Sequence, residues 1–194
     1  MTRSFDARPV DQAVLDALCA ESLRAPTAGN CAGVRMTTLP QEDVSDFFAV
    51  TTDAQWRATS SRYAGLARCG AVVVVTSRPQ DYAARYAESD KAASGLGEID
   101  QWRVPYWHTD AAMATMALLL LLEDEGLGAT LWGNFRHEEE LLEWIGAEDE
   151  LLFASVLVGV GDGRDHRSGS LDRPVPPRTR RVRRRPPPAP SAHQ

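Results

Sequence analysis

Residues 25–34 (APTAGNCAGV) are the part of the sequence whose composition best suits a bound ligand. Small side chains let the backbone approach a flat molecule closely, and the carboxamide of Asn30 can donate and accept hydrogen bonds at once. Together with the hydroxyl of Thr27, this composition favours a site for a planar, polar heterocycle. An ordinary surface loop has the same composition, so these residues by themselves leave both interpretations open.

Other catalytic and binding patterns lack support in the sequence. The glycine run at residues 159–163 (GVGDG) is not followed by a helix that could receive a pyrophosphate, which favours a flexible turn over a dinucleotide-binding loop. No serine stands in a G-x-S-x-G elbow, so a hydrolase is not indicated. The four histidines do not pair at metal-ligand spacing, and we expect no metal site. The three cysteines include no C-x-x-C pair and are expected to be free thiols: Cys19, Cys31 and Cys69.

The ligand-binding residues need a scaffold, and the hydrophobic pattern predicts one with both strands and helices. Asp11 is expected to cap a first helix that stops before Ala25, because the residue ahead of a proline avoids the helical region. Further helices are expected at residues 41–49, 81–88, 109–125 and 138–145, and strands at residues 34–39, 71–76, 127–132 and 151–160. This order predicts an α+β fold, a mixed α/β sandwich of about four core strands.

Charge and composition argue against several classes of protein. The net charge of −6 divides into +7 for residues 164–194 and −13 for the rest, and the acidic body argues against nucleic acid as a partner. The N-terminus does not read as a signal peptide, and the longest apolar stretch is too short to span a bilayer, so we expect a cytoplasmic protein with no membrane contact. We expect one domain at residues 1–163 and an Arg/Pro-rich extension at residues 164–194, disordered beyond Arg181.

Several segments, taken in order, resemble the flavin-dependent nitroreductase family. Residues 5–10 (FDARPV), a helix, and then APTAGN are similar to that family's opening, R-S-x-R-x-F-x-x-x-P-V followed by a helix and A-P-S-x-x-N-x-Q-P-W. Residues 110–122 and 126–135 resemble its central dimer helix and the strand after it, and residues 157–161 (LVGVG) resemble its last core strand. Residues 62–75, with Pro105, Tyr106 and Trp107, look similar to a nitroreductase-like subgroup of high-GC bacteria.

The resemblance implies a nitroreductase-like fold, with a central, mostly antiparallel sheet and a homodimer built on the apolar helix at residues 109–125. It also implies flavin mononucleotide (FMN) at the dimer interface. The residues that it places at the cofactor are Arg3 near the ring, Pro26, Thr27, Ala28 and Asn30 from the partner subunit, and Leu131, Trp132, Gly133 and Asn134 along the ring edge. The backbone N–H of Gly133 would point at the flavin N5 atom, so no catalytic side chain is expected.

Three departures from the family pattern concern the flavin contacts. Aligned on Phe5, the first arginine and serine of the opening would fall at or before Met1. The usual Q-P-W is replaced by Ala32, Gly33 and Val34, which would open space beside the flavin. The family's E-V-V ending is absent, and the basic pair that normally grips the phosphate has three candidates in the tail, Arg173, Arg178 and Arg180.

The activity that the resemblance implies is reduction of an electron-poor small molecule, such as a nitroaromatic or a quinone, by a ping-pong mechanism. NAD(P)H would deliver hydride to the flavin and leave before the acceptor enters the same pocket. Four aromatic residues could form stacking surfaces for flat substrates or could pack in the core: Trp102, Tyr106, Trp107 and Phe135. Two alternatives stay open, a flavin-dependent dehydrogenase of a larger organic substrate and a degenerate, non-catalytic flavin-binding protein.

Overall fold

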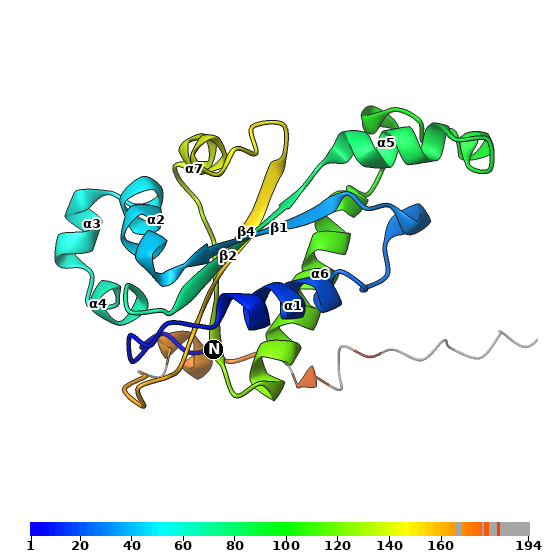
Figure 1. Ribbon diagram of the computed structural model, residues 1–194. Coiled ribbons are helices and arrows are strands. Elements are labelled where there is room, and N and C mark those ends of the chain that lie inside the picture. The colour runs from blue at the N-terminus through cyan, green and yellow to red at the C-terminus, as the bar shows by residue number, and fades with distance from the viewer. Residues whose placement is uncertain (166–167, 176, 179–181, 183–194) are drawn as a thin grey trace, which may run out of the picture.

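A computed structural model describes residues 1–165, 168–175, 177–178 and 182 (Figure 1). Four strands form one sheet in the order β1-β2-β4-β3, and every neighbouring pair is antiparallel. The strands are β1 Val34–Pro40, β2 Ala71–Ser77, β3 Gly128–Trp132 and β4 Leu151–Gly159. The expected α+β fold with a central antiparallel sheet is therefore confirmed.

Helices cover both faces of this sheet. They are α1 Gln12–Ser22, α2 Val44–Thr51, α3 Ala54–Thr59, α4 Tyr63–Leu66, α5 Pro79–Ala87, α6 Tyr106–Asp124 and α7 Glu138–Ile145. Figure 1 shows α1 and α6 on one side of the sheet and α2 and α7 on the other, while α5 extends away from the sheet. The described residues also contain short 3₁₀ turns: η1 Ala28–Asn30, η2 Gln41–Asp43, η3 Ala92–Ser94, η4 Ile99–Gln101 and η5 Gly169–Asp172.

The central strand β2 is buried on both faces, as its run of valines predicts. Because side chains alternate along a strand, Val73 and Val75 pack with α1 and α6, while Val72 and Val74 pack with α2 and α7. Each fully buried valine or leucine contributes about 1.5–3 kcal/mol of transfer free energy. The sheet therefore has two apolar cores, one on each face, and is held rigidly between them.

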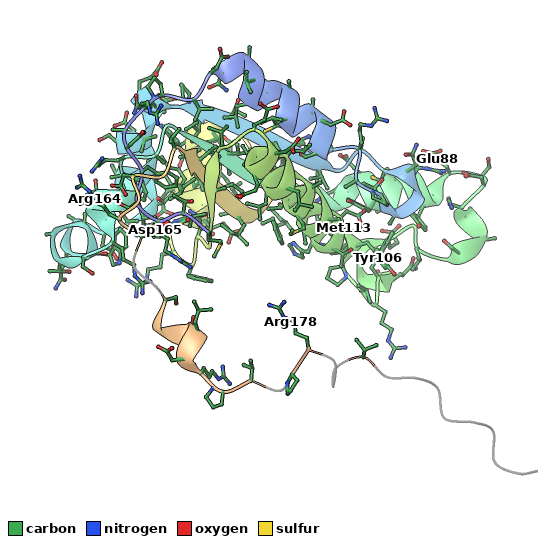
Figure 2. The ribbon with its side chains drawn as sticks, turned by 90° about the horizontal axis from the view of Figure 1, so that it is seen from below. Glu88, Tyr106, Met113, Arg164, Asp165 and Arg178 are labelled. Atoms are coloured by element: carbon green, nitrogen blue, oxygen red, sulfur yellow. The ribbon has the colours of Figure 1, made fainter. Side chains whose placement is uncertain are left out.

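Helix α6 is buried along one side only. Its inward side chains lie in the core between α1 and β2, namely Ala111, Ala114, Leu118 and Leu122. Its other side leaves Met113, Met116 and Leu120 exposed, and Leu120 is 60 % exposed. Figure 2 looks onto this side and shows Met113 on it. The helix thus presents an apolar stripe to solvent in the isolated chain.

The local signals at the first helix are confirmed, whereas other boundaries differ from the expected ones. The carboxylate of Asp11 accepts from the N–H groups of Ala13 and Val14, which makes it the N-cap of α1. The helix expected at residues 41–49 is divided into η2 and α2, and α6 begins earlier, at Tyr106, because Pro105 fits just ahead of a first turn. Helices α3 and α4 were not expected, since six and four residues are too few to show a hydrophobic period.

Within the described residues, no helix is long and apolar enough to cross a membrane. The same residues contain no group of three or more histidine, cysteine or acidic side chains that could hold a metal ion. The disorder expected beyond Arg181 falls, apart from Val182, on residues outside those that the structure describes.

Candidate functional site

The outer edge of the sheet, at β3, carries one group of the expected ligand residues. Thr2 lies beside this edge, where its N–H donates to the carbonyl oxygen of Ala129 at 2.9 Å and its own carbonyl accepts from the Thr130 hydroxyl. Backbone groups of alternate residues in an antiparallel strand point to the same side, so those of Leu131 face the open edge as those of Ala129 do.

The residues that follow β3 line a cavity of about 320 Å³, which we call the aromatic cavity. Its walls are Thr51, Thr52, Asp53, Trp56, Trp132, Gly133, Asn134, Phe135 and Arg136. The rings of Trp56 and Trp132 meet edge to face at 5.6 Å, whereas Phe135 is 95 % exposed. Trp132, Gly133 and Asn134 are therefore brought together at one hollow that has flat apolar walls.

Asn134 contributes an unsatisfied polar group to the aromatic cavity. Its Oδ1 accepts from the hydroxyl of Ser155 at 2.8 Å, but its buried Nδ2 has no hydrogen-bond partner among the described residues. A buried donor left unpaired costs about 1–3 kcal/mol. Asn134 is thus a lining residue whose buried Nδ2 is left without a partner in the single chain.

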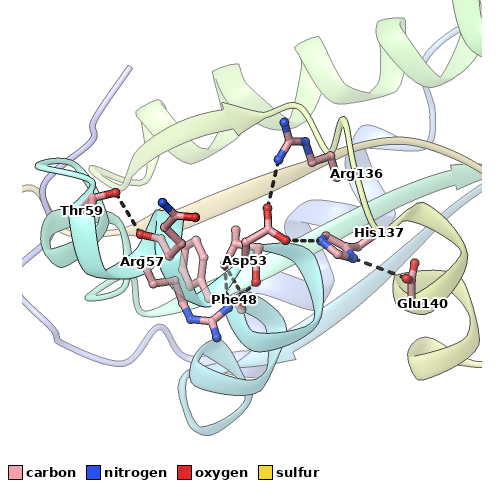
Figure 3. A network of polar contacts seen from close by, with 9 residues as sticks. Phe48, Asp53, Arg57, Thr59, Arg136, His137 and Glu140 are labelled. Carbon is pink, nitrogen blue, oxygen red and sulfur yellow. Dashed lines mark hydrogen bonds and ion pairs between the residues drawn. The ribbon is translucent and has the colours of Figure 1, made fainter.

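Charged residues form a network at the rim of the aromatic cavity (Figure 3). The carboxylate of Asp53 accepts from Arg136 at 3.0 Å and contacts Nε2 of His137 at 3.2 Å, and Nδ1 of His137 lies 3.4 Å from Glu140. The hydrogen bonds to Asp53 and Glu140 raise the pKa of His137. In return, His137 and Arg136 lower the pKa of Asp53. This network joins the residue before α3 to the first turn of α7.

A second hollow, of about 460 Å³, surrounds Arg3 and is called here the cationic pocket. Its walls are Arg3, Ser4, Ser61, Arg62, Ala64, Gly65, Arg68, Asp162, Arg164 and Asp165. Asp162 lies 3.7 Å from Arg68 and 3.9 Å from Arg164, and the N–H of Arg164 lowers the pKa of Asp162. Figure 2 shows Arg164 and Asp165 side by side at this end of the molecule.

The cationic pocket carries an excess of positive charge. Four arginines face two carboxylates, and the guanidinium groups of Arg3 and Arg62 have no acidic partner among the described residues. Asp165 bonds to the backbone N–H of Arg3 at 2.7 Å rather than to its side chain. Because an uncompensated guanidinium offers several N–H donors in one plane, this pocket suits an anionic oxygen-rich group.

The expected partner-side residues lie at the other end of α6, in the turn of residues 26–30. The N–H of Ala28 donates to Asp110 at 2.8 Å, and the carbonyl oxygen of Gly29 accepts from Nε of Arg85 at 2.8 Å. The side chain of Asn30 is exposed and has no hydrogen-bond partner among the described residues. The turn contacts α6 at Asp110, and an α-helix rises 1.5 Å per residue, so about 21 Å of helix separates this contact from the end of α6 at Asp124.

The four expected stacking residues divide between two places. Trp102, Tyr106 and Trp107 form one aromatic cluster with Tyr82 and Tyr86, in which Trp102 meets each of the other four rings within 6.1 Å. Trp107 is buried, which supports core packing for that residue. Phe135 belongs instead to the aromatic cavity.

The space expected beside Gly33 does not exist in the structure. A Cβ atom at Gly33 would lie within 2.4 Å of the ring of Tyr82, and Val34 is buried in the core. The glycine at position 33 is therefore explained by the close approach of Tyr82, whereas Ala32 is exposed.

The tail arginines stay apart from these sites. Arg173 and Arg178 are exposed, and Figure 2 shows Arg178 on a segment that runs clear of the body of the molecule. Arg180 lies outside the described residues. In one copy of the chain, positive charge near Arg3 comes from Arg62, Arg68 and Arg164 instead.

These three arginines were missed in the sequence. A usable signal was the pair Arg62 and Arg68 at the two ends of the short α4, but nothing in the sequence connects them to Arg164. The three cysteines are free and buried. Burial raises the pKa of Cys19 and Cys69 to about 12, so neither forms a thiolate at neutral pH.

Comparisons with known proteins agree on the fold. No curated protein matches the chain. Among solved structures, a candidate nitroreductase from Exiguobacterium sibiricum in complex with FMN is 14 % identical with a TM-score of 0.68, and the alignment covers 95 % of this chain and 92 % of that one. A nitroreductase family protein from Streptococcus pneumoniae is 16 % identical, with a TM-score of 0.67 and coverages of 95 % and 94 %.

A third neighbour is a candidate NAD(P)H:FMN oxidoreductase from Staphylococcus epidermidis, 16 % identical, with a TM-score of 0.66 and coverages of 94 % and 90 %. At such identities these likenesses show the fold alone. The profile of the nitroreductase family, however, matches residues 1–162, which include the whole sheet and all seven α-helices named above. The chain therefore belongs to the nitroreductase family.

Proposed function

We propose that this protein is an FMN-dependent oxidoreductase that acts as a homodimer and uses NAD(P)H to reduce an electron-poor acceptor of the nitroaromatic or quinone type by a ping-pong mechanism. The observation that carries the proposal is the open β3 edge, where the backbone groups of Leu131 face outward, Gly133 follows at the end of the strand, and Thr2, next to Arg3, pairs with Ala129. Two of the structural neighbours named above have FMN in their descriptions, which supports the choice of flavin.

The donor set at this edge fits FMN. The guanidinium groups of Arg3 and Arg62, which have no acidic partner among the described residues, would hold the anionic parts of the cofactor. The N–H of Gly133, a residue of the aromatic cavity, would donate to the flavin ring. No basic or nucleophilic side chain has to react, because the chain's part is to bind and orient.

When bound, FMN would accept hydride from NAD(P)H and pass it to the second substrate. The chain's own contribution to that second step is a set of flat apolar walls in the aromatic cavity, from Trp56, Trp132 and Phe135. Flat walls of this kind accept planar molecules of different outline, which suits a site that takes two substrates in turn.

The dimer is proposed on two grounds. The stripe of Met113, Met116 and Leu120 on α6 is a contiguous apolar surface of the kind that marks an interface. In addition, the turn of residues 26–30 lies at the opposite end of α6 from the beginning of β3. A second copy, packed across α6, would bring its own Pro26, Thr27, Ala28 and Asn30 to the β3 edge of the first.

A visible absorbance spectrum of the purified protein tests the proposal directly. We expect flavin bands that NADPH or NADH bleaches under anaerobic conditions and that a quinone restores. If bound flavin is bleached by neither nicotinamide, the proposed activity is wrong. Bleaching by an organic substrate alone would indicate the dehydrogenase alternative, and bound flavin that no reductant turns over would indicate a non-catalytic member.

Several finer assignments stay predictions. They are NAD(P)H as the cosubstrate, the cytoplasmic location, the high-GC subgroup suggested by residues 62–75, and the division into a flavin-binding domain at 1–163 and an extension at 164–194. The contacts of Arg173, Arg178 and Arg180 with the phosphate are likewise proposed only for the dimer, because Arg173 and Arg178 lie away from the cationic pocket in a single chain.

A further inference from the structure

Helix α6 contains one acidic residue in its buried side, Asp110. The side chain is fully buried, whereas the residues that follow it on the inner face of the helix are apolar. No ion pair with Asp110 is found among the described residues. A buried carboxylate is costly unless hydrogen bonds compensate it, so the donors that reach Asp110 explain why it is tolerated there.

Those donors come from the turn of residues 26–30, from α5 and from the neighbouring Thr109, whose hydroxyl donates to Oδ1 at 3.4 Å. Oδ2 of Asp110 accepts from the backbone N–H of Ala28 at 2.8 Å and from the hydroxyl of Tyr82 at 3.0 Å. Burial, together with the adjacent Asp110, raises the pKa of Tyr82, which therefore stays protonated as a donor. Hydrogen bonds inside a protein are stronger than in water, because their surroundings screen them less.

The turn that Asp110 holds has a backbone shape that needs support. Gly29 has φ 66° and Asn30 has φ 54°, so two successive residues are left-handed. Arg85 donates to the carbonyl oxygen of Gly29, and the ring of Tyr86 lies where a Cβ of Gly29 would be, at 2.7 Å. Arg85 is itself fixed by two contacts of 2.8 Å with Asp90. The turn is thus held from three directions.

These contacts fix the backbone that carries the side chain of Asn30. Asn30 is exposed and its carboxamide has no partner among the described residues, although the backbone around it is fixed. A fixed backbone that carries a free carboxamide loses little conformational entropy when it binds a ligand.

We propose that Asp110 is a positioning residue, which fixes the turn of residues 26–30 from within α6 and thereby determines how tightly that turn binds FMN at the partner's β3 edge. This inference rests on the proposed function. It also assigns α6 two tasks, since the same helix carries the apolar stripe for the second copy and the carboxylate that shapes the ligand turn.

The test compares Asp110→Ala with Asp110→Asn in the full chain. The alanine variant removes the acceptor of the Ala28 N–H, whereas asparagine keeps one carbonyl oxygen at the same place. We expect amide hydrogen exchange at residues 28–31 of the flavin-free protein to become at least 10-fold faster in Asp110→Ala. We also expect its FMN dissociation constant, from quenching of flavin fluorescence, to rise at least 10-fold, with Asp110→Asn within about 3-fold of the wild type.

Thr115→Val is the matched control, because Thr115 is buried on the same helix and bonds only to the carbonyl of Ala111. It should lower the unfolding temperature without altering exchange at Ala28 or FMN affinity. Tyr82→Phe, which removes one donor and keeps the packing, should shift both readouts in the same direction as Asp110→Ala but less, and it serves if the alanine variant does not fold.

Two results would overturn the inference. Unchanged exchange at Ala28 in Asp110→Ala and Tyr82→Phe would show that Asp110 does not hold the turn, and faster exchange with unchanged FMN affinity would show that holding the turn has no effect on binding. A wild-type protein that binds no FMN would instead defeat the proposed function, and the exchange data would still show whether Asp110 holds the turn.

Discussion

The β3 edge and the turn of residues 26–30 belong to the same proposed flavin site, yet they are built in opposite ways. The edge is open: Thr2 covers it only as far as Ala129 and Thr130, and Phe135 extends into solvent. The turn is closed, since Asp110, Arg85 and Tyr86 fix it from three directions. One half therefore offers unsatisfied donors, and the other offers a fixed shape.

This contrast explains why a second copy of the chain would be needed. An open edge with free N–H groups can receive a ligand but does little to orient it. A turn that is already fixed adds orientation at small entropic cost, but in a single chain it lies at the far end of α6. We infer that dimerisation brings the open β3 edge of one copy together with the fixed turn of residues 26–30 of the other.

Separating the two halves should have the largest effect. In Met116→Glu/Leu120→Glu, two charges enter the apolar stripe of α6, and a desolvated, unpaired charge opposes association strongly. We expect a monomer by light scattering and FMN affinity lowered at least 100-fold. Val14→Glu on the exposed side of α1 is the control and should leave both unchanged. A monomeric variant that keeps its flavin would contradict the shared site.

Distorting the closed half comes next. In Gly29→Ala the new side chain meets both a positive φ and the ring of Tyr86, so we expect a loss of about 1–3 kcal/mol in unfolding free energy, together with weaker FMN binding. Gly95 has φ 70° but open space around it, so Gly95→Ala reports the backbone strain alone. Denaturant unfolding of the pair measures the difference, and equal losses would show that Tyr86 does not constrain the turn.

Removing charge from the open half should affect binding and not folding. Arg62 has no acidic partner among the described residues, so Arg62→Ala should leave the unfolding temperature unchanged. If it contacts an anionic part of FMN, the dissociation constant should rise about 10-fold or more, since hydrogen bonds to charged groups contribute about 1.5–3 kcal/mol. Arg103→Ala, at an exposed arginine outside the cationic pocket, is the matched control in the same fluorescence titration. Equal affinities would exclude Arg62 from the site.

The smallest effect concerns the rim of the aromatic cavity. Asp53 and Glu140 raise the pKa of His137 in the folded protein. The stability that these charged contacts contribute is therefore full below the ordinary histidine pKa of 6.5, and it is lost as the pH rises through the raised pKa. At the acid end, the lowered pKa of Asp53 keeps its contacts until the pH falls through that value. The unfolding temperature should therefore fall slightly between pH 6 and pH 9.

Asp53→Asn is the variant that checks this assignment. Without the carboxylate, an NMR titration should show the pKa of His137 moving back toward its ordinary range, and the pH dependence of unfolding should weaken. The same pKa in wild type and variant would show that Asp53 does not hold His137.

The fold could be predicted to a large extent because its signals are local. The AVVVVT run of β2, the cap at Asp11 and the alternation of four strands each depend on neighbours within a few residues. The site could be predicted only in part. Residues 132–134 line one cavity, and Arg3 lies on the same edge of the sheet. The resemblance to the nitroreductase family indicated these positions, whereas the spacing of residues along the sequence did not.

The sequence by itself determined the sheet, its two apolar faces and the free, inert cysteines, since hydrophobic periodicity and residue type are written along the chain. Only the tertiary structure decided which charges meet. Arg3, Arg62 and Arg164 converge although Arg3 and Arg164 lie 161 positions apart in the sequence, and Asp110 reaches Ala28 across 82 positions. Such contacts depend on how the helices pack on the sheet, and no local pattern records that packing.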